Sequence, residues 1–419
     1  MPIGTRGWPV ESGIPLQGLE ATSYPGQRKI LYDGTNQWSF YFDGSNTVYR
    51  YSTNGGQTWS ASGVRPFTKT VGVKFASIWY DSANGEVYVV GDKSTSGKDI
   101  WVINGTVNPG THTITWLPAG EQVLTVSAFN QASKYAYICK DTSGYLWIMS
   151  SNATTNSGPW DLSVFKSLSQ GNVAAWVHSG NMIAGGYTAA EVKGSIVPAG
   201  TGSQVWAIYT YGGNVACRKY TASWSSQVLI QTGSGTQNGP MLLAPPSAVV
   251  DSRNVVHVVY GSCNESGTAK PHVMYAHNLT ASTSFTSGLD LDPTIPQNVG
   301  DISPTISLDS STGNLFAFWI RTDASDVGRT IMGKKNVSGT WTSQSFASDT
   351  TTQKQHLTSI YSSPSETYIS WQWTQNATAG AIEVQFESKI PEFPSVVMPV
   401  IFIVGVFMYV SRRKPRRKA

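Results

Sequence analysis

The chain has 419 residues, of which 13% are charged and 11% aromatic, and it contains 15 Trp and 19 Tyr. Intrinsic disorder requires high charge with few aromatic residues, and helical bundles are rich in Ala, Glu, Lys and Leu, so this composition excludes both and predicts an all-β protein. The net charge of +4 arises in the tail: residues 391–419 hold six bases and one acid, which leaves 23 bases and 24 acids in residues 1–390 and no electrostatic basis for binding nucleic acid.

The N-terminal residues 1–15 contain no apolar stretch, so no signal peptide is visible. A domain that faces outward needs an export signal. We therefore expect that the chain lacks its native start or that its start is misassigned. The alternative is a tail-anchored protein whose body stays in the cytoplasm.

One β unit is repeated along residues 20–390. An apolar strand, a polar turn and a second apolar strand recur at 29–42, 76–90, 135–149, 195–209, 247–260, 305–319 and 357–371, about 55 residues apart. The copy at 195–209 has Gly in its turn, and the copy at 357–371 is degenerate. The other five turns each contain an aspartate, at Asp33, Asp81, Asp141, Asp251 and Asp309. Because these acids recur with the repeat, we interpret them as structural caps of the turns rather than catalytic carboxylates.

A second landmark follows the same repeat. A turn and then an aromatic residue open the last strand of six units, at Trp59, Trp116, Trp160, Trp224, Phe285 and Trp341. Four-stranded units of about 40–60 residues are typical of a β-propeller, whose closed ring leaves no open end. We predict seven four-stranded blades, with six as the alternative. The seventh unit lacks its own last strand after residues 382–388, and the segment around residues 8–20 is expected to supply it.

One turn carries a specific motif, Ser52-Thr53-Asn54-Gly55-Gly56-Gln57-Thr58-Trp59. It resembles the Asp-box, Ser-x-Asp-x-Gly-x-Thr-Trp, of sialidase and BNR-repeat β-propellers, and it departs from that pattern in having Asn at the third position. The expected role is structural: Asn54 caps the amides of the turn, Gly56 takes a positive φ, and Trp59 packs between blades. Asp-boxes in that family lie away from the active face, so the motif is predicted to belong to the scaffold.

Catalytic residues are not predicted. Sialidases need an arginine triad, an acidic Asp and a Tyr–Glu pair, and their first arginine lies in an Arg-Ile-Pro motif; here only Arg28-Lys29-Ile30 stands in that neighbourhood. His257 and His272 are candidates for the base of a polysaccharide lyase, although strand histidines are more often simply packed. No Gly-rich phosphate loop, HExxH motif or nucleophile elbow occurs, so neither a metal nor a cofactor is expected.

Two further sequence features bear on the cellular compartment in which the protein resides. Six Asn-x-Ser/Thr sequons fit an exported chain and are candidates for glycosylation, at Asn104, Asn152, Asn264, Asn278, Asn336 and Asn376. The three cysteines, Cys139, Cys217 and Cys263, are far apart in the sequence. We expect them to be buried thiols, and the alternative is one disulfide between two of them.

The C-terminus is predicted to be a membrane anchor. Residues 393–410 contain no charge and are just long enough for a helix to cross the hydrocarbon core, and residues 411–419 then hold six bases. The positive-inside rule places residues 411–419 in the cytoplasm and residues 1–390 outside the cell.

Residues 391–395 resemble the PEF-type sorting tails of archaeal surface proteins, in which a motif like Pro391-Glu392-Phe393-Pro394 precedes a hydrophobic helix and a basic end. The resemblance implies that an archaeosortase-type enzyme recognises this tail and that the tail is exchanged for another anchor.

Residues 1–390 are therefore expected to form an extracellular propeller that binds glycans or proteins of the cell envelope, because Trp and Tyr suit stacking on sugars. Two alternatives remain: a surface glycoside hydrolase or polysaccharide lyase of the sialidase-like superfamily, and a purely structural envelope protein. Arginines or paired carboxylates that converge on the central channel would favour an enzyme. A channel lined by Ser, Thr and apolar residues would favour binding or a scaffold.

Overall fold

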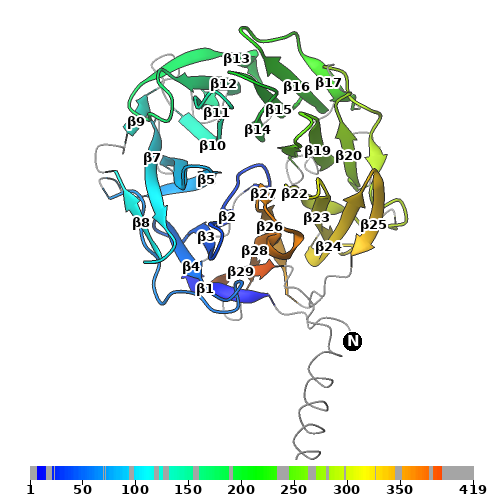
Figure 1. The fold of residues 1–419 in the computed structure, drawn as a ribbon. Coiled ribbons are helices and arrows are strands. Elements are labelled where there is room, and N and C mark those ends of the chain that lie inside the picture. Colours follow the sequence, from blue (N-terminus) through cyan, green and yellow to red (C-terminus); the bar gives the residue numbers. More distant parts are fainter. Residues whose placement is uncertain are drawn as a thin grey trace, which may run out of the picture.

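The computed structural model describes residues 7–15, 21–22, 24–68, 70, 72–93, 99–117, 122–125, 132–153, 160–187, 192–233, 245–262, 270–279, 283–296, 299–325, 327–344, 352–376 and 381–388. These residues form strands and a short 3-10 helix, η3 (Glu366–Tyr368), which confirms the predicted all-β class. Seven separate sheets stand in a ring around a common centre, the arrangement of a β-propeller (Figure 1).

The sheets follow one another in chain order. The first three are formed by β2 (Ile30–Tyr32), β3 (Gln37–Phe42) and β4 (Thr47–Ser52); by β5 (Val73–Asp81), β6 (Glu86–Lys93), β7 (Asp99–Asn108), β8 (Thr113–Trp116) and β9 (Gln122–Thr125); and by β10 (Ala132–Lys140), β11 (Leu146–Ala153), β12 (Trp160–Ser167) and β13 (Trp176–Tyr187). The fourth and fifth are formed by β14 (Gly194–Pro198), β15 (Val205–Tyr211), β16 (Asn214–Tyr220) and β17 (Val228–Gln231); and by β18 (Ser247–Val250), β19 (Val256–Gly261), β20 (Val273–His277) and β21 (Leu289–Asp290). The last two are formed by β22 (Asp301–Asp309), β23 (Leu315–Thr322), β24 (Gly328–Val337), β25 (Thr340–Gln344) and β27 (Ser362–Ser363); and by β26 (Lys354–Ser359), β28 (Ser370–Asn376), β29 (Ala381–Ser388) and β1 (Trp8–Pro15).

Each sheet is covered on both faces by its neighbours, and for this reason its middle strands are apolar throughout. Strands β3, β11 and β19 are buried at every position. Between the second and third sheets, Val90 and Val102 pack against Ile138 and Ile148. Continuous apolar runs of this kind are expected for strands that have no solvent-facing side.

Four of the seven sheets have the four strands that the repeat predicts. Among the described residues the first sheet has three, and the pairing of Tyr49 with Val64 marks the place of a fourth. Pro66, two residues further on, has no amide hydrogen with which to extend that ladder. The second and sixth sheets gain a fifth strand, because β9 pairs with β7 and β27 pairs with β22.

The N-terminal strand closes the ring. Strand β1 pairs antiparallel with β29, so the seventh sheet combines the start of the chain with its last repeat, which confirms the closure expected from the segment around residues 8–20. Val10 and Ile14 on β1 are 1% and 2% exposed and join the core of that sheet. The ring is therefore held shut by a strand whose sequence lies more than 360 residues from its partner.

Residues 24–29 run into the centre of the ring, and we call them the central segment. The side-chain amide of Gln27 donates to the carbonyl oxygens of Phe75 and Ala136, on the second and third sheets, at 2.6 and 2.9 Å. A Cβ at Gly26 would lie 1.9 Å from the carbonyl oxygen of Gly194, on the fourth sheet, so only glycine fits there. The central segment thus ties inner strands from several sheets together.

Within the described part of the chain, no helix is long and apolar enough to span a membrane. The predicted span at 393–410, the PEF motif and the basic end all lie outside the described residues.

Candidate functional site

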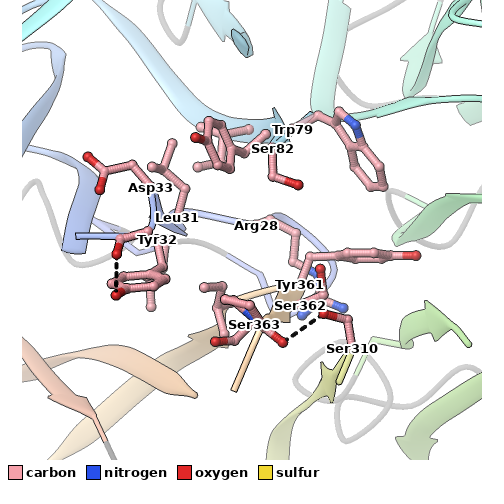
Figure 2. Close-up of a pocket in the computed structure, with 16 residues that line it drawn as sticks. Arg28, Leu31, Tyr32, Asp33, Trp79, Ser82, Ser310, Tyr361, Ser362 and Ser363 are labelled. Atoms are coloured by element: carbon pink, nitrogen blue, oxygen red, sulfur yellow. Dashed lines mark hydrogen bonds between the residues drawn. The ribbon is translucent and has the colours of Figure 1, made fainter. Parts of the chain in front are cut away.

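Two adjoining hollows lie at the end of the inner strands where the aspartate turns are found. The smaller has a volume of about 260 Å³ and the larger about 1050 Å³. Both are lined by Trp79, Tyr80, Ser82, Tyr361 and Ser362, so we treat them as one feature, the central groove. Figure 2 shows that side chains from β2, from β5 and from the segment after β26 converge on the smaller hollow.

Arg28 of the central segment lines the smaller hollow (Figure 2). Its guanidinium donates to the carbonyl oxygens of Ile306 at 2.8 Å, Ala248 at 2.7 Å and Ser359 at 3.3 Å. Burial lowers the pKa of Arg28 to about 10, although the nearby Tyr361 hydroxyl opposes this shift. Because carbonyl groups of the fifth, sixth and seventh sheets take up its donors, Arg28 fastens the ring at its centre and is not presented to a substrate carboxylate.

Trp79, near the end of β5, and Tyr361, just after β26, form an aromatic wall of the central groove. Their ring centroids lie 4.7 Å apart with the planes at 57°, and both side chains are partly exposed. The amide of Val250 donates to the Tyr361 hydroxyl at 3.2 Å and so fixes that ring. Aromatic faces beside a few polar groups are the usual lining of a site for an organic ligand.

The larger hollow has a charged wall built around Lys140, the last residue of β10. Its ammonium lies 2.6 Å from Asp81 Oδ2 and 3.3 Å from Glu86 Oε2, and the hydroxyl of Tyr88 donates to Glu86 at 2.5 Å. Burial alone would raise the pKa of Asp81, but hydrogen bonds from Lys140, Asn84 and the Ala83 amide, together with the charge of Lys140, outweigh it and lower that pKa below its usual value. In this wall one ammonium is shared by two carboxylates, and Glu86 is the most exposed member at 34% of its side chain.

The turn aspartates accept hydrogen bonds from the amides of their own turns. In the third sheet, Asp141 Oδ1 accepts from the amides of Ser143 and Tyr145, while Oδ2 accepts from the indole of Trp147 at 2.7 Å. The amide two residues further on also donates to Asp33, Asp81, Asp251 and Asp309, and a second turn amide donates to Asp33, Asp251 and Asp309. Asp33, Asp81 and Asp141 also line the central groove, which the repeat alone did not reveal.

The Asp-box-like turn follows β4 at the rim of the first sheet. Asn54 Oδ1 accepts from the Thr58 amide at 2.9 Å, and the Gly56 amide donates to Ser52 Oγ at 2.8 Å. Gly56 has a φ of +93°, and Trp59 meets Phe386 of β29 edge to face with ring centroids 4.8 Å apart. The turn therefore packs against the closing sheet and does not line the central groove.

The two candidate bases lie apart from the groove. His257 is buried with its Nδ1 2.8 Å from the Tyr275 hydroxyl and its Nε2 3.4 Å from Asp251, and burial lowers its pKa despite that carboxylate. His272 pairs with Asp290 at 2.7 Å. His257 is thus a packed strand histidine, whereas His272 precedes β20 and is partly exposed beside its carboxylate.

Arginines do not converge on a common point among the described residues. Apart from Arg28, four of them are held by carboxylates at separate places: Arg50 by Glu11, Arg253 by Asp251, Arg329 by Asp323, and Arg321 by Asp292 and Asp301. The same residues contain no group of three His, Cys, Asp or Glu arranged to hold a metal ion.

A second cluster, which the sequence did not indicate, lies at the opposite end of the inner strands. The ring of Tyr24 meets Tyr135 at 4.8 Å and His356 at 5.7 Å, and the ammonium of Lys193 lies 3.9 Å from the Tyr24 ring centroid. Tyr135 and His356 have φ of +57° and +53°, and each sits where the register of its inner strand shifts. Bulges of this kind re-aim side chains and are frequent beside functional sites.

The structure describes five of the six sequon asparagines and two of the three cysteines. Asparagines of four sequons are at most 7% exposed, at Asn104, Asn152, Asn278 and Asn336. Asn376 is partly exposed, and Asn264 lies outside the described residues. Cys139 and Cys217 are free and buried, and Cys263 also lies outside that part of the chain.

The sequence pattern did not indicate Trp79 and Tyr361 as site residues, because each lies in an apolar segment of the repeat and therefore resembles a core residue. One signal was available: in 76–90 the aromatic pair Trp79-Tyr80 stands directly before the turn aspartate, where a strand leaves the core.

Comparisons with known proteins bear on the fold and on the tail. Residues 390–414 match the family described as the PEF-CTERM archaeal protein sorting domain. The search of curated proteins found no match. Among solved structures, a PL25 ulvan lyase has a TM-score of 0.54 at 10% identity over 92% of this chain and 96% of its own. A PL25 ulvan lyase bound to -[GlcA(1-4)Rha3S]- has a TM-score of 0.53 with the same identity and coverage.

The Trypanosoma rangeli sialidase in complex with the inhibitor DANA is also similar, with a TM-score of 0.48, 11% identity and coverage of 81% of this chain and 60% of its own. The ulvan lyase likeness shows the β-propeller fold and, at 10% identity, nothing beyond it. The sorting domain confirms the resemblance of the tail to PEF-type tails and marks the chain for processing and anchoring at the cell surface.

Proposed function

We propose that this protein is a seven-bladed surface propeller, each sheet being one blade, that binds a glycan of the cell envelope in the central groove. The observation that carries the proposal is the pair Trp79 and Tyr361, two partly exposed aromatic rings at the mouth of the ring centre. The exposed Ser82 and the partly exposed Asp33 and Ser362 stand beside them and offer hydrogen-bond partners for sugar hydroxyls.

The tail completes this proposal. Residues 393–410 span the membrane, residues 411–419 stay in the cytoplasm, and residues 1–390 face outward, where envelope glycans are found. An archaeosortase-type enzyme recognises this tail by the motif at residues 391–395 and exchanges it for another anchor. The match of residues 390–414 to a sorting domain supports this arrangement.

A Trp79→Ala variant tests the binding site. Loss of the stacking ring should weaken binding of any glycan identified on an array at least tenfold, equivalent to about 1.4 kcal/mol. Trp116→Ala is the matched control, because Trp116 is also partly exposed but packs at the outer edge of the second sheet. Equal affinity in the two variants, with both still folded by circular dichroism, would contradict the groove as the site. Absence of any bound glycan would instead favour the structural alternative.

A second candidate function is polysaccharide lyase chemistry at the Tyr24 cluster. Elimination needs a base for the proton beside a uronate carboxylate, a cation for that carboxylate, and an acid for the leaving oxygen. Tyr24, His356 and Lys193 bring these three types of group together. Unsaturated uronate released from an acidic polysaccharide, and lost on Tyr24→Phe, would support this candidate. No release would leave binding as the function.

A further inference from the structure

The charged groups of the central groove indicate which chemical class of glycan fits there. Four carboxylates line it, those of Asp33, Asp81, Glu86 and Asp141, against two cationic side chains, Arg28 and Lys140. At neutral pH the ordinary state of an aspartate or glutamate is ionised, so the lining carries an excess of negative charge.

The two cations are already engaged. Lys140 is paired with Asp81 at 2.6 Å and Glu86 at 3.3 Å. Arg28 donates to the carbonyl oxygens of Ile306 and Ala248 and is 4% exposed. A sulfate or uronate group that entered the groove would meet carboxylates without gaining a cation, which is the arrangement that rejects an anion.

The same lining suits neutral sugars. Carboxylate oxygens are strong acceptors for hydroxyl donors. Those of Asp33, Asp81 and Asp141 already accept from their own turns, so Glu86, which is 34% exposed, is the carboxylate most open to a sugar hydroxyl. The exposed side chains of Ser82 and Asn84 add groups that both donate and accept. With the rings of Trp79 and Tyr361 alongside, the groove combines acceptors with apolar faces. A pyranose is complementary to this lining, because its hydroxyl groups can donate to the acceptors and the apolar faces of its ring can stack on the aromatic side chains.

We propose that the ligand of the central groove is an uncharged, hydroxyl-rich glycan and that the groove excludes glycans bearing carboxylate or sulfate. This inference rests on the proposed function of the groove. It is independent of the Tyr24 cluster, which lies at the other end of the inner strands and contains Lys193.

The test compares matched probes on the full chain in detergent. Neutral probes are mannohexaose, cellohexaose and chitohexaose; anionic probes are oligogalacturonate, hyaluronate hexasaccharide and a sulfated galactan oligomer. We expect at least one neutral probe to bind, with affinity reduced tenfold or more by Trp79→Ala, and no anionic probe to bind in a manner that depends on Trp79. Binding confined to anionic probes and lost in Trp79→Ala would overturn the inference while leaving the groove as the site. Absence of any binding that depends on Trp79 would overturn the proposed function itself.

A Glu86→Gln variant gives a second test, because it should change the affinities for neutral and anionic probes in opposite directions. Removing this charge should weaken the neutral probe, which loses an ionised acceptor, and should raise affinity for the anionic probes at least threefold. Glu383→Gln is the control, because Glu383 hydrogen-bonds Gln375 and Gln385 on the seventh sheet and does not line the groove. An anionic probe that binds Glu86→Gln and Glu383→Gln equally would contradict the electrostatic argument.

Discussion

At the scale of single residues, Trp59 and Asn54 show how the Asp-box-like turn acts on the scaffold. Trp59 contacts Phe386 on the closing sheet, and a Cβ at Gly56 would lie 2.2 Å from the ring of Phe386, so the turn fits closely over that side chain. The hydroxyl of Ser388 also donates to the carbonyl oxygen of Gly55 at 2.6 Å. The turn therefore connects the first sheet with the last, which is a structural task.

We expect Trp59→Ala to lower the free energy of unfolding by about 3 kcal/mol, because the ring is half-buried against the core of the seventh sheet. Asn54→Ala removes an exposed cap and should cost about 1 kcal/mol. Neither change should alter glycan affinity in molecules that remain folded. Denaturant unfolding measured beside binding checks both expectations, and unchanged unfolding with lost binding would place the ligand at this turn instead of the groove.

At the scale of elements, the closing strand β1 decides whether the ring holds together. Without it, β29 would present an unpaired edge to solvent, and the core positions filled by Val10 and Ile14 would be empty. An up-and-down sheet within a ring gains stability only when both ends are joined, so this strand matters more than its eight residues suggest.

Deletion of residues 1–15 should lower the free energy of unfolding by about 3–6 kcal/mol from the loss of those two buried side chains alone, and should promote aggregation through the exposed edge. Deletion of residues 1–6 is the control, because it removes nothing from β1. Thermal unfolding and light scattering make the comparison. Equal melting temperatures for the two deletions would show that another segment closes the ring.

At the scale of the whole molecule, the sequence predicted the repeated local elements but not the long-range contacts that form at the centre of the ring. The aspartate turns, the inner and second strands and the closing role of the N-terminus follow from local pattern, because Asp141 or Asp309 caps a turn by bonds to its own neighbours. Arg28 bonds to partners 220, 278 and 331 residues away, and no local pattern records such contacts. The groove is unpredictable for the same reason: Trp79 on the second sheet and Tyr361, just after β26 of the seventh, become neighbours only when the ring is assembled.

The anchor is also a property of the whole chain, and its test separates a membrane span from mere attraction to lipid. Deletion of residues 391–419 should move the protein from the membrane fraction to the soluble fraction. The six bases alone contribute about 1 kcal/mol each at an anionic surface, so they too bring the chain to membranes, but in a salt-dependent way. A second deletion, of residues 411–419, removes those bases and keeps the apolar stretch at 393–410. If that stretch spans the bilayer, this variant should stay in the membrane fraction even in high salt. Release of the second variant by salt would show that the tail is held by charge, and membrane retention of the first would place the anchor elsewhere in the chain.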